Sequence, residues 1–366
     1  MHIFKQTIRS IFLKLGVEIG RSKGESKMMG ALPTSNKAHP SLFSSKFQIS
    51  DVETAFSLVR EKWANHSVVL LIDREMESPS KPFSIVRCDQ CSVNEIHKFD
   101  IRKTVFVYAC DSDSTGLPFV RELVDRKGVF FPIQVYTPSS YANVEDMARK
   151  VIESQFLEQT KAGFCKFDFG PGDSINLIQA ISATLNVAGD YIEIGCYRGS
   201  SACVALAYMK ESRIRRSCFF LDVFDGFTYQ AAKDSADAMW EGTHVTEGLE
   251  IVNHRIQTHC DPEAGLTANV IKANIIEDEL PAQISEVAVA NIDVDLYEAV
   301  FVALVKVAPK MAVGGIIVVE DPGHTPALIG SRLALSEFMK TQVASSFTSI
   351  YLESGQTFLI RVLKHQ

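Results

Sequence analysis

The stretch DYIEIGCYRGSSACVALAYM, residues 190–209, decides the fold class of this chain. Residues 190–194 predict a β-strand, the glycines at 195 and 199 predict a tight turn, and residues 200–209 predict a helix. Glycines at such a turn let the backbone approach a ligand closely at the start of the following helix. The stretch therefore indicates a strand–turn–helix unit with a candidate binding loop.

The same alternation of strands and helices continues on both sides of this stretch. Further strands are predicted at residues 218–221, 287–292 and 315–319, and further helices at 174–184, 249–258, 297–307 and 327–339. Such alternation is typical of an α/β protein with a parallel sheet, which binds ligands at the carboxyl ends of its strands. Residues 347–352 and 357–363 flank a turn and predict a closing hairpin, which would add an antiparallel strand at one edge.

The chain of 366 residues is longer than one hydrophobic core usually serves, so we expect more than one domain. Residues 51–145 contain short apolar runs and predict a smaller α/β domain, whose role the sequence does not reveal. Residues 146–366 form the predicted larger domain. Residues 21–50 are rich in Ser, Lys and Pro, a composition typical of a polar linker.

Residues 1–20 predict a basic amphipathic helix, with apolar side chains near one face and lysine and arginine between them. Lys14 interrupts the apolar run that a signal peptide would need, so we expect a cytoplasmic protein with reduced cysteines. Such a helix can lie on an anionic membrane surface, dock on a partner, or pack on its own domain. Peripheral contact with the inner face of the membrane therefore stays one option.

The overall charge gives no support for binding nucleic acid. Lysine and arginine number 37 against 44 aspartate and glutamate residues, a formal net charge of −7. A nucleic-acid backbone is held by an excess of basic residues, so we expect no nucleic-acid partner. The sequence does not establish the oligomeric state, and a homo-oligomer is compatible with it.

Acidic residues follow four predicted strands of the larger domain or lie at their ends. Glu193 precedes Gly195 in a GxxxG pattern, which lacks the GxGxxG of dinucleotide-binding proteins and fits an S-adenosylmethionine site better. Asp222 follows the second strand, where a carboxylate can accept hydrogen bonds from the two hydroxyl groups of a ribose. Either feature alone could belong to a structural turn or a helix cap.

Three more carboxylates are expected to converge at the same edge of the sheet. Asp293 ends one strand, and Glu320 and Asp321 end the next. Carboxylates brought together repel one another unless a cation lies among them, and ligation by oxygen alone suits a hard ion such as Mg²⁺. The sequence therefore predicts a divalent metal site, with costly burial of unpaired carboxylates as the alternative.

Residues 186–340 resemble the macrocin O-methyltransferase family of class I, metal-dependent enzymes, which methylate sugar hydroxyls in antibiotic and polysaccharide biosynthesis. The matching words are AGDYIEIGCYRGSSA, FFLDVFDGF, VIKANIIEDELP, IDVDLYEA and KMAVGGIIVVEDPGH, in the order of the family. The resemblance implies a Rossmann-like class I methyltransferase sheet. It says nothing about residues 1–150.

The resemblance also implies a role for each matched position of the cofactor site. Glu193, Gly195 and Gly199 would line the methionine end of S-adenosylmethionine, with Ser200 at the start of the next helix. Asp222 would hold the ribose of the cofactor.

The metal site and the base are implied in the same way. Asp293, Glu320 and Asp321 would be the metal ligands, although the family usually has Asp where Glu320 stands. Asp295 matches the aspartate proposed as general base in relatives with the D-x-D-x-Y word, and His324 is a second candidate.

The function predicted from the sequence is S-adenosylmethionine-dependent O-methyl transfer to a small-molecule or glycan acceptor that contains a sugar. A metal that binds two vicinal oxygens would lower the hydroxyl pKa, and a carboxylate base would take the proton. Residues 228–247 are expected to face the acceptor, and Met239, Trp240 and His244 could contact a sugar ring or only pack a lid. A nicotinamide-dependent oxidoreductase and a non-catalytic scaffold that binds a partner are the alternatives.

Overall fold

The computed structural model describes residues 49–73, 83–110, 113–132, 144–163, 169–234, 240–325 and 328–363. The helix expected over residues 1–20 and nearly all of the linker expected over 21–50 lie outside these residues. Met239, expected near the acceptor, also lies outside them. The described residues form two compact units, with the boundary between Phe156 and Leu157, inside helix α4 (Asp146–Lys161). The boundary expected from the sequence, at residue 146, lies at the start of the same helix.

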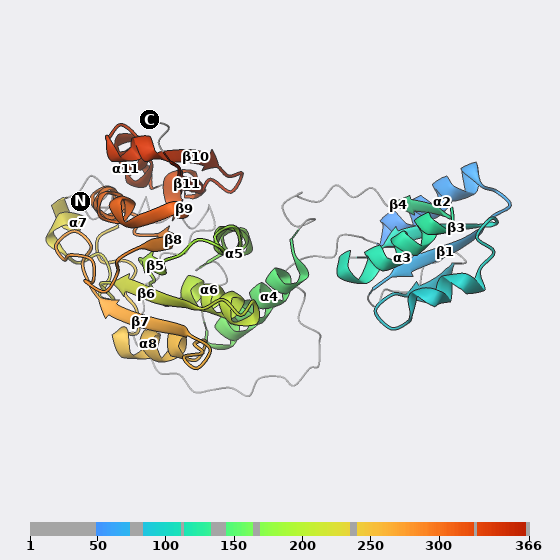
Figure 1. Ribbon diagram of the computed structural model, residues 1–366, viewed down its shortest axis with the longest axis horizontal. Helices are drawn as coiled ribbons and strands as arrows, with labels where there is room; N and C mark the ends of the chain where they lie inside the picture. The colour runs from blue at the N-terminus through green and yellow to red at the C-terminus, as the bar shows by residue number, and fades with distance from the viewer. Residues whose placement is uncertain are drawn as a thin grey trace, which may run out of the picture. The chain divides into compact units, whose positions relative to one another are not determined.

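The smaller unit contains a four-stranded parallel sheet with the order β2-β1-β3-β4 (Figure 1). Its elements are α2 (Ile49–Lys62), β1 (Ser67–Ile72), β2 (Ser84–Arg87), a 3-10 helix (Val93–Lys98), β3 (Thr104–Ala109), α3 (Asp113–Asp125) and β4 (Val129–Pro132). Alternate residues of β1 belong to two cores, one against α2 and the other against α3 and the 3-10 helix. Burial on both faces explains the apolar run SVVLLI of β1.

The larger unit contains a seven-stranded sheet with the order β10-β11-β9-β8-β5-β6-β7. Its strands are β5 (Asp190–Ile194), β6 (Arg216–Asp222), β7 (Leu266–Lys272), β8 (Val287–Ile292), β9 (Met311–Val319), β10 (Phe347–Tyr351) and β11 (Thr357–Arg361). Pairing is parallel from β7 to β9, and β11 runs antiparallel to both β9 and β10. The predicted Rossmann-like α/β class with a closing hairpin is confirmed.

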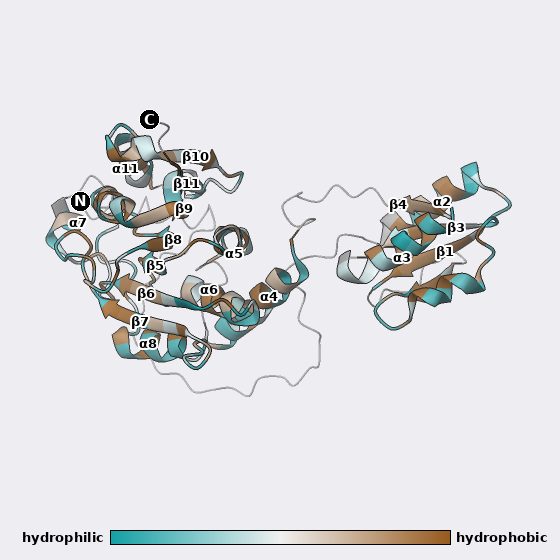
Figure 2. Cartoon of the chain, in the orientation of Figure 1, coloured by the Kyte–Doolittle hydropathy of each residue, from teal (hydrophilic) through white to brown (hydrophobic). Residues whose placement is uncertain are grey.

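Helices cover both faces of this sheet, as the alternating pattern predicted. They are α5 (Pro171–Ala183), α6 (Ser200–Glu211), α7 (Gln230–Asp234), α8 (Leu249–Gln257), α9 (Tyr297–Val307), α10 (Asp321–His324) and α11 (Ile329–Phe338). The largest core joins α9 and α11 to one face of the central strands, which include Ile192 and Ile194 of β5. Hydrophobic residues concentrate on the strands and on the inward sides of the helices (Figure 2).

The structure differs from the sequence prediction at the sheet edges. Strand β7 was not predicted, because only its first residue, Leu266, is buried and the others carry no continuous apolar signal. The antiparallel strand β11 is an inner strand, and β10 takes the edge beyond it. The short strand β2 was also missed, since two of its four residues are exposed.

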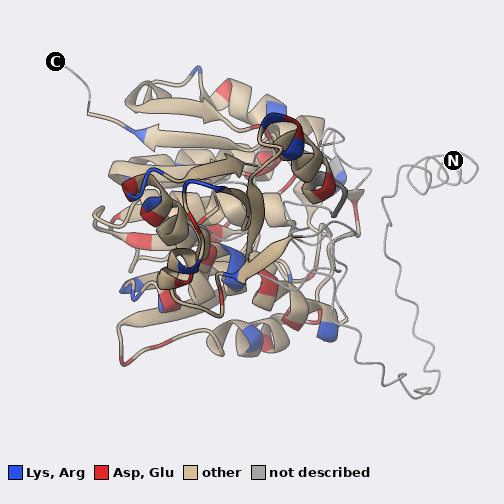
Figure 3. Cartoon of the chain, turned by 90° about the vertical axis from the view of Figure 1, so that its right-hand side faces the viewer, with Lys and Arg blue, Asp and Glu red and all other residues tan. Residues whose placement is uncertain are grey.

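Charged residues of both signs are interspersed along the described helices and loops (Figure 3). Among the described helices, none combines the length and the apolar character that crossing a membrane requires.

Candidate active site

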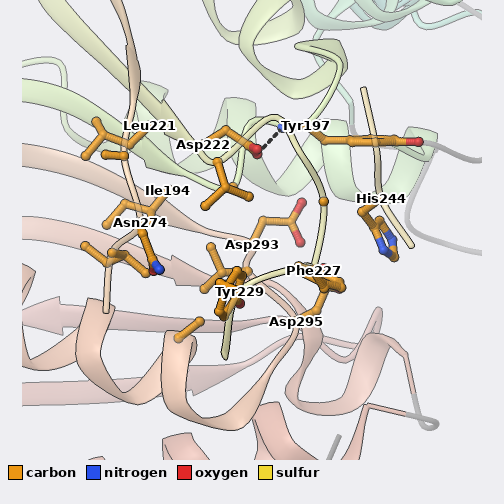
Figure 4. A pocket seen from close by; sticks show the side chains of 17 residues that line it. Ile194, Tyr197, Leu221, Asp222, Phe227, Tyr229, His244, Asn274, Asp293 and Asp295 are labelled. Carbon is orange, nitrogen blue, oxygen red and sulfur yellow. Dashed lines mark hydrogen bonds between the residues drawn. The ribbon is translucent and has the colours of Figure 1, made fainter. Parts of the chain in front are cut away.

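An open pocket of about 510 Å³ lies at the carboxyl edge of the larger sheet, beside the ends of β5, β6 and β8. The chain leaves β5 towards β6 on one side and later returns to β8 on the other, so the strand order reverses at β5. Open α/β sheets bind their ligands at such a point. In Figure 4 the carboxylate of Asp293 lies near the centre of the view, with His244 on one side and Asn274 on the other.

The glycines of the first loop are explained by packing inside the protein. Gly195 has a φ of +93°, and a Cβ at this position would lie 1.8 Å from the backbone oxygen of Asp293. Gly199 has a φ of +82°, and a Cβ there would lie 3.0 Å from Cγ1 of Ile256 on α8. Gly195 lines the pocket, whereas Gly199 and the buried Ser200 are not among its lining residues.

Asp222 joins the loops that follow β5 and β6. Its Oδ2 accepts a hydrogen bond from the backbone N–H of Tyr197 at 2.7 Å, and its Oδ1 accepts one from Phe224 at 2.6 Å. Burial raises the pKa of Asp222, and these hydrogen bonds oppose the rise. A carboxylate offers about four acceptor positions, so Asp222 keeps the capacity to accept from a ligand in the pocket that it lines.

Glu193 lies behind the binding loop and is completely buried. Tyr191 donates its hydroxyl hydrogen to Oε2 at 2.6 Å, and Ser201 of α6 donates to Oε1 at 2.5 Å. Burial raises the pKa of Glu193 to about 7, although both hydrogen bonds lower it. Glu193 is not among the residues that line the pocket, so this structure gives it a supporting place beneath the loop.

The raised pKa of Glu193 predicts how stability changes with pH. Because the folded-state pKa exceeds the unfolded value of 4.5, the stabilisation is complete below pH 4.5 and disappears as the pH rises to about 7. The loss amounts to about 3 kcal/mol. Glu193→Gln should not show this loss. The difference between its free energy of unfolding and that of the wild type should therefore shift in favour of the variant as the pH rises.

Urea unfolding at several pH values measures this difference. The chain has two tryptophans, so a Trp63→Phe background leaves Trp240 as the fluorescent reporter of the larger unit. Parallel stability curves for the two proteins between pH 5 and 7.5 would show that Glu193 is already ionised in the folded state.

An acidic cluster forms one side of the pocket. Single carboxylate oxygens of Asp293, Asp295 and Asp321 all lie within 4.8 Å of one another. Burial raises the pKa of Asp293 well above its ordinary value, and the charges of Asp321, Glu320 and Asp295 raise it further. Oδ2 of Asp321 is buried and has no hydrogen-bond partner among the described residues. Three converging hard oxygen ligands with an unsatisfied atom fit a divalent cation such as Mg²⁺.

Two residues expected in the site lie outside this cluster. Glu320 is buried and accepts a hydrogen bond from Nε2 of Gln356, on the turn before β11, and it is not one of the three residues whose oxygens lie within 4.8 Å of one another. Its charge still raises the pKa of Asp293, and its Oε1 has no hydrogen-bond partner among the described residues. Nε2 of His324 lies 3.1 Å from Oδ1 of Asp173, and His324 is not among the residues that line the pocket.

A group of aromatic side chains also lines the pocket. The ring of His244 lies 4.8 Å from that of Phe227 and 5.5 Å from that of Tyr197, measured between centroids, and Tyr229 lies next to Phe227. The sequence had placed His244 near the acceptor, and Tyr229 belongs to the loop expected to face it, whereas no such role was expected of Tyr197 and Phe227. The only sequence feature that could have identified these two residues is that each lies close to the end of a strand. Aromatic residues of the hydrophobic core often occupy such positions too, so the feature does not distinguish a binding residue.

Comparison with known proteins finds similarity to O-methyltransferases within the larger unit. Residues 175–350 match the family described as Macrocin-O-methyltransferase (TylF). The chain is 28% identical over 145 residues to the demethyldecarbamoylnovobiocin O-methyltransferase of Streptomyces niveus, which covers 37% of this chain and 53% of that protein. The chain thus spans about half the length of this curated relative.

Solved structures with a similar fold include two methyltransferases. The O-methyltransferase NovP is 21% identical, with a TM-score of 0.44, and the match covers 52% of this chain and 79% of NovP. The calicheamicin methyltransferase CalS11 is 16% identical, with a TM-score of 0.43, and the match covers 59% of this chain and 91% of CalS11.

Proposed function

We propose that the larger unit, in which residues 175–350 match the macrocin O-methyltransferase family, transfers the methyl group of S-adenosylmethionine to a hydroxyl group of a sugar or sugar-containing acceptor. The observation that carries the proposal is one pocket, at the reversal of strand order, lined by both Asp222 and the acidic pair Asp293 and Asp295. A cofactor and an acceptor could therefore lie side by side in it.

The cofactor would be held by the loops after β5, β6 and β7. Gly195 and Tyr197 come from the first loop, Asp222 from the second, and Asn274 from the third, and all four line the pocket. The free acceptor positions of Asp222 suit the hydroxyl groups of a ribose. Backbone hydrogen bonds already hold Asp222 in place, so little conformational freedom is lost when a ligand binds.

Asp293 and Asp321 would hold the metal, and Asp295 would act as the base. A divalent cation bound there supplies a positive charge that lowers the pKa of a coordinated hydroxyl group and orients it. Asp295 lines the same pocket and lies within the cluster, so its carboxylate can accept the proton of that hydroxyl group. General-base catalysis of this kind typically contributes about 10²–10⁴-fold.

Two measurements test the proposed function. Calorimetry should detect binding of S-adenosylhomocysteine, with NAD⁺ as the competing ligand; preferential binding of NAD⁺ would favour the oxidoreductase alternative. Methyl transfer from labelled S-adenosylmethionine to a panel of glycans and sugar-containing small molecules then tests turnover. If the protein binds S-adenosylhomocysteine but methylates no compound in a native extract, the result would favour the alternative of a non-catalytic scaffold.

Asp222→Ala should weaken binding of S-adenosylhomocysteine by roughly 10- to 150-fold, the equivalent of a lost charge-assisted hydrogen bond of about 1.5–3 kcal/mol. The substitution removes the acceptor for the ribose and also releases the N–H groups of Tyr197 and Phe224. Asp225→Ala is a matched control, because Asp225 is exposed, pairs with Lys272 and is not among the residues that line the pocket. Unchanged affinity in Asp222→Ala, measured by calorimetry, would remove Asp222 from the cofactor site.

A further inference from the structure

The pocket wall that contains His244 is held by hydrogen bonds between two chain segments. The N–H of Phe227 donates to the carbonyl oxygen of Thr243 at 3.1 Å, and the N–H of Gly242 donates back to Phe227 at 3.0 Å. Gly226 has a φ of +73°, and a Cβ there would lie 2.3 Å from the oxygen of Thr243. Residues 226–227 and 242–243 therefore pack backbone against backbone, which makes this wall a preformed part of the pocket.

His244 has a backbone conformation that costs energy. Its φ is +58°, in the left-handed region that few residues with a Cβ adopt, although histidine tolerates it better than most. Such strain persists only where the surroundings enforce it, and it is concentrated at functional sites. Here the paired segments enforce it and place the imidazole in the wall of the pocket, to one side of Asp293 (Figure 4).

The hydrogen bonds of Thr243 determine which nitrogen of His244 carries the hydrogen. The hydroxyl of Thr243 lies 2.7 Å from the carbonyl oxygen of Trp240, which can only accept, so the single hydroxyl hydrogen is used there. Nδ1 of His244 lies 2.8 Å from the same hydroxyl oxygen. Since that oxygen can then only accept, Nδ1 must be the donor, and Nε2 keeps its lone pair.

The imidazole is also neutral at physiological pH. Burial, together with the positive charge of Arg198, lowers the pKa of His244 to about 4. A neutral ring with hydrogen on Nδ1 presents one acceptor, Nε2, for which no partner is recorded among the described residues. The side chain is partly exposed, so a ligand in the pocket can reach it.

We propose that His244 is a specificity-determining residue, whose Nε2 accepts a hydrogen bond from a hydroxyl group of the sugar acceptor. This inference rests on the proposed methyl transfer. A site built to pair with a hydroxyl group rejects an analogue that lacks it, because the polar atom of the protein is then left unpaired. His244 would thus select acceptors that place a second hydroxyl group within reach of its Nε2, and the rings of Phe227 and Tyr197 keep its imidazole in place.

Nitrogen-15 NMR of histidine-labelled protein tests the assignment of the hydrogen. The chain has nine histidines, and His244→Phe identifies the signals of His244 by their loss. We expect Nδ1 as the N–H nitrogen and Nε2 as the unprotonated nitrogen at neutral pH. Thr243→Val, which removes the acceptor for Nδ1, should produce a mixture of the two tautomers. An N–H signal at Nε2 in the wild-type protein would overturn the proposal.

Binding of a probe sugar tests the role. Methyl α-D-mannopyranoside, which carries vicinal hydroxyl groups, is added to the protein with S-adenosylhomocysteine and Mg²⁺. The NMR signal of Nε2 should shift towards that of a hydrogen-bonded nitrogen when the sugar is added. A signal of Nε2 that does not change on addition of the sugar would overturn the proposal. His244→Phe keeps an aromatic ring and should weaken sugar binding roughly tenfold, as expected for one lost hydrogen bond. His244→Gln, whose amide oxygen can replace Nε2, should restore part of the affinity.

Affinity for S-adenosylhomocysteine separates this inference from the proposed function. We expect the same affinity in wild type, His244→Phe and His244→Gln, because no cofactor contact is assigned to His244. Loss of S-adenosylhomocysteine binding in the wild type would defeat the proposed function. Normal binding of S-adenosylhomocysteine, together with equal sugar affinity in wild type and His244→Phe, would defeat only the role of His244.

Discussion

Asp293→Ala is expected to abolish binding of Mg²⁺ and to lower methyl transfer on the order of a thousandfold, while the protein stays folded. A bound metal ion stabilises the charge that develops in the transition state by several kcal/mol, and each 1.4 kcal/mol corresponds to a factor of ten in rate. The two carboxylates assigned to the metal, Asp293 and Asp321, cannot hold it singly, so Asp321→Ala should behave in the same way. Calorimetry with Mg²⁺ and a methyl-transfer assay of the same preparation measure both effects.

The free energy of unfolding without metal separates this effect from misfolding. Burial and the neighbouring carboxylates raise the pKa of Asp293, so removing this side chain relieves repulsion, and the metal-free variant should be no less stable than the wild type. Glu279→Ala is the matched control, since it removes an acidic side chain that is 90% exposed. Wild-type turnover in Asp293→Ala would exclude this cluster as the reaction centre.

Asp295→Asn is expected to lower the rate of methyl transfer at neutral pH by about 10²–10⁴-fold and to leave affinities for Mg²⁺ and S-adenosylhomocysteine nearly unchanged. Asparagine keeps the shape of the side chain but cannot accept the proton. Asp295 has a φ of +58°, and asparagine is among the residues that adopt this conformation most readily. A folding defect is therefore not expected to obscure the kinetic effect.

Two other outcomes would change the assignment. Loss of Mg²⁺ affinity in Asp295→Asn would make Asp295 a third metal ligand, which its place in the cluster also permits. Turnover close to that of the wild type would defeat the assignment of Asp295 as the base. His324→Ala is the matched test of the second candidate, and we expect it to retain most of the rate, because His324 pairs with Asp173 and is not among the residues that line the pocket.

The sequence predicts those residues of the candidate site whose location depends only on their position along a strand. Asp222, Asp293 and Asp295 follow parallel strands, and the carboxyl ends of parallel strands meet at one edge of the sheet, so their convergence needed no coordinates. Side-chain direction could not be predicted in the same way. Glu320 and Asp321 are adjacent in the sequence, yet Asp321 joins the acidic cluster and Glu320 faces Gln356, which is brought there by the closing hairpin.

The sequence by itself determined the fold class, the central strands and the candidate family, because apolar periodicity, glycine turns and strand-end carboxylates are local features. Only the tertiary structure decided that Glu193 lies beneath the loop, because its position depends on which face of β5 packs against Ser201 of α6. The same holds for His244. Its strained backbone, its tautomer and its place at the pocket all depend on the pairing of residues 226–227 with 242–243, and contacts between segments distant along the chain leave no periodic pattern in a single sequence.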